Sequence, residues 1–164
     1  MPGFHDNNGS DMGLKDWFSR VTGAVGEADQ STVAGPNLAV AALLVEVLRA
    51  DYNVGPDERR EVVRSVSAML KLDAAAAEDL TAEAERHADQ SHDLYQFTSQ
   101  VNRTFSDEEK VALLEALWRV AQADAIVHKY EEHLIRRVAD LIHVSHRGFI
   151  AAKLRAAGEL PVAD

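Results

Sequence analysis

The sequence predicts an all-α protein, a pseudo-twofold bundle of seven or eight helices built from two helix–loop–helix repeats. Three observations support this fold class. The 164-residue chain has only four prolines and nine glycines, which leaves long uninterrupted segments. No segment shows the sustained alternation of apolar and polar residues that marks a half-buried strand. Finally, two stretches of the chain carry similar residues at matching positions, which indicates an internal duplication.

The two repeats cover about residues 38–73 and 111–145. Equivalent positions lie 73 residues apart up to an acidic pair: Leu44/Leu117, Val47/Val120, Ala50/Ala123, Asp51/Asp124 and Glu58/Glu131. After that pair the best alignment shifts by one residue, matching Val62/Leu134, Val63/Ile135 and Val66/Val138. The repeats therefore predict two similar helical hairpins, each with an Asp before its loop and a Glu after it.

Residues 1–35 are expected to form a mobile N-terminus outside the folded domain. Residues 1–11 are polar and rich in Gly and Asn. Apolar residues then recur at helical spacing and predict a short amphipathic helix at 12–25, followed by a linker at 26–35; they are Leu14, Trp17, Phe18, Val21 and Val25. We expect this helix to pack on its own domain, with a partner protein or a membrane surface as the alternatives.

The folded domain is expected at residues 36–157, before a frayed tail at 158–164. Pro36 is placed as a first-turn proline of a helix that reaches about Asp51 through the apolar run LAVAALLVEVL. Pro56 opens a second helix to about Lys71. Asp73 is a suitable N-cap for a third helix, whose residues AAAAEDLTAEAERHA favour helix strongly.

A shorter helix at about 94–103 is expected to bridge the two halves. Ser106 and Glu109 then form the S-x-x-E pattern of a capping box, which predicts a helix from there to about Asp124. After a loop at 125–128 comes a helix to about His143, and Ser145 caps the last helix.

Composition excludes several functional classes. The net charge of −10 argues against general nucleic-acid binding, which depends on Lys and Arg neutralising phosphates. The absence of cysteine excludes disulfides, thiolate metal sites and a cysteine nucleophile. The most apolar run, residues 38–48, is much shorter than the roughly 20 residues that span a bilayer, and the N-terminus lacks the pattern of a secretory signal. A cytoplasmic protein that is not itself transmembrane is expected.

The acidic pair of each repeat is the feature most suggestive of a site. A Glu in the first turn of a helix is electrostatically favourable, whereas an Asp at a helix C-terminus is not. Asp51 and Asp124 both have this unfavourable placement, so each needs a compensating interaction. One explanation is that each Asp accepts amide protons from its own loop and fixes a tight turn. The other is that the loops bind a divalent cation.

A Ca²⁺ or Mg²⁺ ion would be bound by oxygen ligands, about six to eight for calcium and six in octahedral geometry for magnesium. The candidate ligands are Asp51, Asn53, Asp57 and Glu58 in the first loop, and Asp124 and Glu131 in the second. The first loop is the better candidate because it offers more oxygens. Neither loop is an EF-hand, since DYNVGPDERREV has glycine at the wrong position and ends in Val62 instead of Glu.

Catalysis has little support in the sequence. There is no nucleophile elbow, no glycine-rich phosphate loop and no metalloprotease motif. The sequence alone therefore predicts a protein that is not an enzyme.

The duplicated helix–Ala-Asp–loop–Glu–helix unit resembles the tellurite-resistance protein B (TerB) family. So does the C-terminal run FSDEEKVALLEALWRVAQADAIVHKYEEHLIRRVADLIHVSHRGFIAAKLRA, which is similar to stand-alone members of that family. The resemblance covers about residues 36–157. The family often has glycine directly after the Asp, where this chain has Tyr52 and Ala125.

The resemblance implies an all-helical fold without demonstrated catalysis and a role in resistance to tellurite and other stresses. It also implies binding of divalent metal at Asp51 and Glu58 and at Asp124 and Glu131, and contact with a protein partner that is membrane-associated. Related domains occur at the N-terminus of a membrane-anchored DnaJ-type co-chaperone. By that likeness, the alternative function is a metal-independent adaptor whose acidic loops are purely structural.

Overall fold

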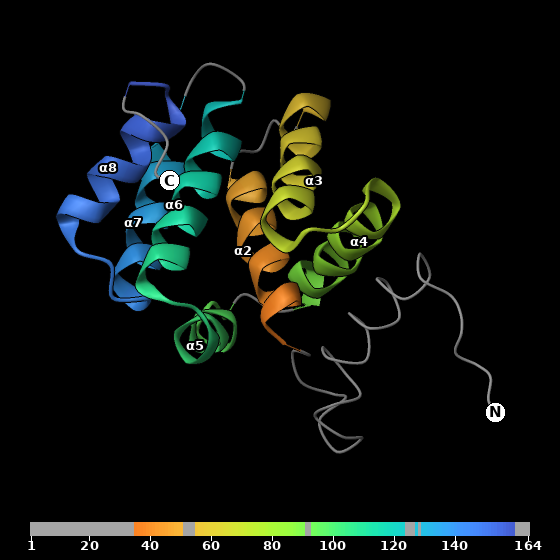
Figure 1. Cartoon of the computed structure of the whole chain (residues 1–164). Helices are drawn as coiled ribbons and strands as arrows, with labels where there is room; N and C mark the ends of the chain where they lie inside the picture. The colour runs from red at the N-terminus through yellow and green to blue at the C-terminus, as the bar shows by residue number, and fades with distance from the viewer. Residues whose placement is uncertain (1–34, 51–54, 91–92, 124–126, 128, 160–164) are drawn as a thin grey trace.

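A computed structural model describes residues 35–50, 55–90, 93–123, 127 and 129–159. Within these residues the protein has seven helices and no strand, so the all-α class is confirmed (Figure 1). The helices are α2 (Pro36–Ala50), α3 (Pro56–Leu70), α4 (Ala74–Gln90), α5 (Tyr95–Thr104), α6 (Asp107–Gln122), α7 (Lys129–Leu141) and α8 (His146–Ala156). The helix expected at 12–25 lies outside the described residues.

Helices α2 and α6 form the centre of the bundle. They lie side by side, with α3 and α4 on one flank, α7 and α8 on the other, and α5 across one end (Figure 1). Ten of the 15 residues of α2 are buried, which is far more than the single stripe of a surface helix. The apolar run of the sequence therefore encodes a core helix, as expected.

The duplication is visible in which side chains the two central helices bury. A spacing of 73 residues relates eight buried positions of α2 to eight buried positions of α6: Val40/Leu113, Ala41/Leu114, Ala42/Glu115, Leu43/Ala116, Leu44/Leu117, Val45/Trp118, Val47/Val120 and Leu48/Ala121. Glu46 and Arg119, which have the same spacing, are both half-buried. The two helices therefore present equivalent faces to the core.

The structure corrects the one-residue shift that the sequence alignment placed directly after the acidic pair. The buried positions of α3 and α7 keep the spacing of 73 residues: Glu58/Glu131, Val62/Ile135, Ser65/Val138 and Val66/Ala139. The shift occurs only at the last turn, because α7 ends earlier than α3 relative to its start. The sequence alone did not distinguish a spacing of 72 residues from one of 73 here, because neighbouring residues such as Leu134 and Ile135 are both apolar.

Helices α3 and α7 end in the same way. Lys71 and His143 have φ angles of 58° and 65°, which is the left-handed conformation that closes a helix C-terminus. The next residues, Leu72 and Val144, donate backbone hydrogen bonds of 3.1 and 2.9 Å to Ser67 O and Ala139 O. These bonds are the six-to-one pairs of a Schellman motif, and their positions lie 72 residues apart.

The third helix of each half also matches. Asp73 Oδ1 accepts from the Ala76 amide at 2.8 Å, and Ser145 Oγ accepts from the Gly148 amide at 3.1 Å, so both predicted N-caps are confirmed. Helix α4 packs on α2, as α8 packs on α6. The duplication therefore extends beyond the two helix–loop–helix repeats to a third helix in each half, which makes two matching three-helix units, α2–α4 and α6–α8.

Helix α5 joins the two units. Its Phe97 and Val101 are buried in the core. On its other flank, Asn102 Nδ2 donates a hydrogen bond of 2.9 Å to the carbonyl oxygen of Leu141. This carbonyl belongs to the last residue of α7 and has no partner within its own helix. The bridging helix thus supplies a cap to the second unit.

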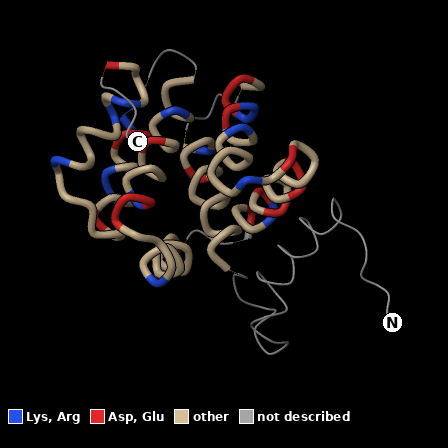
Figure 2. The backbone as a smooth tube through the Cα atoms, in the orientation of Figure 1, with Lys and Arg blue, Asp and Glu red and all other residues tan. Residues whose placement is uncertain are grey.

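A salt-bridge network joins α3 to α4. Arg59 donates to Glu78 at 2.7 Å and to Glu85 at 3.0 Å. Figure 2 shows acidic and basic residues interleaved along these two helices. The hydrogen bond from Arg59 lowers the pKa of the Glu78 carboxyl below its ordinary value. Because this shift depresses a carboxyl pKa, the pair stabilises the fold fully above the pKa of the unfolded state and loses its effect as the pH falls through the folded pKa.

The Ser145 cap provides a first test of the fold. We expect Ser145→Ala to lower the free energy of unfolding by about 1 kcal/mol, because the first turn of α8 loses the acceptor for an amide that helix geometry leaves unpaired. Urea denaturation followed by circular dichroism measures this loss. Ser99→Ala on α5, whose hydroxyl only donates to the Gln96 carbonyl, is the control and should change stability less.

The network of Arg59 provides a second test. We expect Arg59→Gln to destabilise the protein at pH 7, and the difference from the wild type to shrink as the pH falls below about 4.3, the ordinary pKa of glutamate. Denaturation at a series of pH values measures this trend. Arg64→Gln is the control, because Arg64 is exposed and pairs only along its own helix, with Glu61 at 3.5 Å. A difference independent of pH would contradict the role of the carboxylates.

Candidate functional site

The candidate site in the first repeat is built on the first turn of α3. Glu58 occupies the third position of that helix, and its Oε1 accepts a hydrogen bond of 3.0 Å from the Gly55 amide, the N-cap residue. The side chain is only 1% exposed. Because the N-terminus of a helix carries partial positive charge, this position favours a carboxylate. The sequence predicted the position of Glu58 but not its burial.

The candidate site in the second repeat is the first turn of α7. Glu131 stands at the equivalent position of that helix and is completely buried. Removing a carboxylate from water is costly, and buried carboxylates in proteins are normally paired, hydrogen-bonded or bound to a cation. The same acid is therefore buried at the equivalent position of both halves, and both copies of the duplication share this feature.

The neighbouring acidic residues are oriented differently. Asp57 precedes Glu58, but its side chain is 72% exposed and it binds Arg60 of the same helix at 2.6 Å. In the second repeat, Glu132 follows Glu131, is half-exposed and binds Arg136 at 3.2 Å. Each first turn therefore has one buried carboxylate and one carboxylate that pairs with an arginine at the surface.

The remaining predicted ligands, Asp51, Asn53 and Asp124, lie outside the described residues. Among the residues that the structure does describe, no group of three acidic or histidine side chains lies close enough to hold a metal ion. The described part of the candidate sites is therefore one buried carboxylate at the start of a helix in each, Glu58 or Glu131, together with the exposed Asp57 in the first. The prediction of a cation site stays a prediction.

Arg59, next to Glu58 on α3, reaches across to α4. Its guanidinium binds Glu78 through both terminal nitrogens, at 3.0 and 2.7 Å, and Glu85 through Nε and one terminal nitrogen, both at 3.0 Å. Sequence spacing gave no signal for this contact, because its partners are 19 and 26 residues away. Arg59 thus anchors the turn that carries Glu58 to the neighbouring helix.

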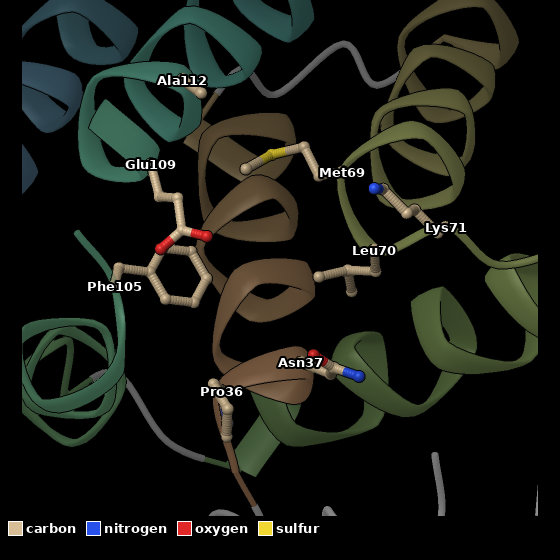
Figure 3. A pocket seen from close by; sticks show the side chains of 8 residues that line it. All are labelled: Pro36, Asn37, Met69, Leu70, Lys71, Phe105, Glu109 and Ala112. Atoms are coloured by element: carbon tan, nitrogen blue, oxygen red, sulfur yellow. The ribbon is translucent and has the colours of Figure 1, made fainter. Parts of the chain in front are cut away.

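Two surface hollows lie away from the acidic turns. One, of about 440 Å³, is lined by the start of α2, the end of α3 and the start of α6, so it is at the opposite end of α3 from Glu58 (Figure 3). The other, of about 490 Å³, lies on α6 beside Arg155 of α8. Neither is lined by Glu58 or Glu131. No helix in the described part of the chain is long and apolar enough to cross a membrane.

Comparison with known proteins agrees with the resemblance seen in the sequence. Curated proteins and solved structures give no match to the chain. The model of one family, described as tellurite resistance protein TerB, matches residues 37–154, which includes helices α3 to α7 and all but the first residue of α2 and the last two of α8. The matched region contains both three-helix units and both buried glutamates. The chain therefore belongs to the TerB family.

Proposed function

We propose that this protein is a non-catalytic interaction module of a cytoplasmic stress response related to tellurite resistance, and that its two acidic inter-helix loops bind a divalent cation. Membership of the TerB family supports the link to tellurite resistance. The observation that carries the cation proposal is the burial of Glu58 and Glu131 at equivalent points of the two units. Ca²⁺ or Mg²⁺ is the ion class that carboxylate oxygens favour.

The proposed ligands of each loop include both described and undescribed residues. Glu58 acts with Asp51, Asn53 and Asp57 in the first loop, whereas Glu131 acts with Asp124 in the second. Asp57 would have to leave its contact with Arg60 to join such a site. The second loop offers fewer ligands, so we expect the first loop to bind the ion more tightly.

One observation favours a second function, a metal-independent adaptor resembling a co-chaperone domain. Glu58 already accepts the amide proton of Gly55, which is the reciprocal bond of a capping box. In this alternative the acidic loops only fix the entry of α3 and α7, and a partner protein recognises an exposed helical face. That partner would be a protein, including one attached to a membrane, rather than nucleic acid, because the chain carries a net charge of −10.

Substitution of the buried acids separates the two functions. Glu58→Gln keeps an oxygen that accepts the Gly55 amide but removes the charge. If the loops bind a cation, millimolar Ca²⁺ or Mg²⁺ at ten times the dissociation constant should stabilise the wild type by about 1.4 kcal/mol. For a domain of this size this corresponds to a rise in melting temperature of about 3–6 °C. Glu58→Gln and Glu131→Gln should each reduce that rise.

The matched controls are other glutamates of the same two helices. Glu61→Gln on α3 and Glu132→Gln on α7 remove a charge from acids that already pair with Arg64 and Arg136, so the effect of the ion should persist in them. A wild type whose melting temperature does not respond to millimolar ion would remove the cation proposal. In that case Glu58→Gln should change stability by no more than about 1 kcal/mol, because its hydrogen bond remains.

Binding of the partner provides an independent measurement. If the loops bind a cation that organises the interaction surface, capture of partner protein from a native lysate should fall when a chelator is added and return when Ca²⁺ or Mg²⁺ is restored. Capture by Glu58→Gln should then be weak in both conditions. Capture that is unchanged by chelator, together with wild-type capture by Glu58→Gln, would favour the metal-independent adaptor.

A further inference from the structure

The hollow at the end of the bundle is an apolar groove with charged edges. It lies where α2 begins, α3 ends and α6 begins, and it has a volume of about 440 Å³. Met69, Leu70 and Phe105 extend toward its middle (Figure 3). All three are only partly buried and pack against the main core. The groove is therefore a place where the hydrophobic core continues to the surface, and such surface favours an apolar occupant.

The edges of the groove carry opposite charges. Lys71 lies exposed on the α3 side, where the left-handed turn places it at the rim, and Glu109 lies exposed on the α6 side. Glu109 is one of three acids in the first turn of α6, with Asp107 and Glu108. An occupant with cations beside its apolar face, and an acid near Lys71, would complement this arrangement.

The chain itself supplies a segment with these properties. Pro36, the first residue of α2, lines the groove, so the preceding residues join the domain at the groove's edge. Residues 12–25 of that portion carry Leu14, Trp17, Phe18, Val21 and Val25 at the spacing of one helical face. The same segment has the charged residues Lys15, Asp16 and Arg20. A helix of 14 residues is marginal alone in water, so it needs a surface to pack on.

The connection limits how far this segment can travel. Residues 26–35 span at most about 33–36 Å when fully extended. A tether of this length keeps the segment near the groove at an effective concentration on the order of millimolar. Even a weak apolar contact is therefore sufficient for docking within one molecule.

We propose that residues 12–25 form an amphipathic helix that docks in the groove between α2, α3 and α6 of the same molecule. Its aromatic pair, Trp17 and Phe18, packs on Met69, Leu70 and Phe105. Lys15, on one flank of the apolar face, faces the acidic first turn of α6. The docked helix covers an end of the bundle distant from Glu58. This inference does not depend on the cation proposal.

Tryptophan fluorescence of the full-length protein tests the docking. The chain has two tryptophans, and Trp118 is 0% exposed, so quenching by acrylamide reports mainly on Trp17. We expect the quenching constant of the wild type to be several-fold below that of a free peptide of residues 12–25. Ala112→Arg, which places a long cation at an exposed position lining the groove, should raise quenching to near the peptide's value.

Ala68→Arg is the matched control, because Ala68 is exposed on α3 but does not line the groove. It should leave Trp17 protected, and circular dichroism should show that both variants keep the helical fold. In amide NMR spectra, Trp17→Ala should shift the resonances of Leu70 and Phe105, while Ser19→Ala, off the apolar face, should shift them far less. Shifts at the groove with Trp17→Ala would support the proposed position independently of the fluorescence.

Three results would overturn the proposal. The first is a Trp17 as accessible to acrylamide in the wild type as in the free peptide. The second is protection that survives Ala112→Arg unchanged, which would place the helix elsewhere on the domain. The third is protection that appears only as protein concentration rises, since the segment would then occupy the groove of a second copy instead of its own.

Discussion

The packing of α2 against α6 is the constraint on which the rest of the structure depends. Each helix is buried on nearly all sides, so each needs neighbours around most of its circumference. Helices α4 and α5 pack on α2, α8 packs on α6, α3 and α7 each contact both central helices, and the two central helices cover one another. The buried positions of α2 and α6 are related by a constant spacing of 73 residues, so the two helices bury equivalent surfaces. A change in either central face would therefore alter how both units fit together.

Much of this fold could be predicted from the sequence because its signals are local. Pro36 and Pro56 begin helices, and Asp73, Ser106 and Ser145 lie at helix starts, as their side-chain chemistry requires. The third helix of each unit was not recognised as part of the duplication because similarity faded after the second helix, where the caps Asp73 and Ser145 differ in residue type. The shift in alignment was misplaced because neighbouring apolar residues, such as Leu134 and Ile135, were equally acceptable matches for Val62.

The candidate site could be predicted only in part. A glutamate in the first turn of a helix is sufficiently explained by the helix dipole, so nothing in the sequence pattern indicates that Glu58 and Glu131 are almost fully removed from water. Burial is a property of the packed helices rather than of the turn. The contact of Arg59 with α4 was also hidden, because it depends on how two helices lie in space. Asp51, Asn53 and Asp124 are known at present only through the sequence.

The left-handed residues that end α3 and α7 have a consequence for the energetics of the chain. Most helices that close in this way use glycine, because a side chain in this conformation is disfavoured by about 1–2 kcal/mol. This protein uses Lys71 and His143 and accepts that cost in both units. The C-terminal ends of α3 and α7 are therefore less stable than they would be with glycine at these positions. Lys71 offers a reason at the end of α3, because a glycine there would remove the only positive charge among the described residues that line the apolar groove.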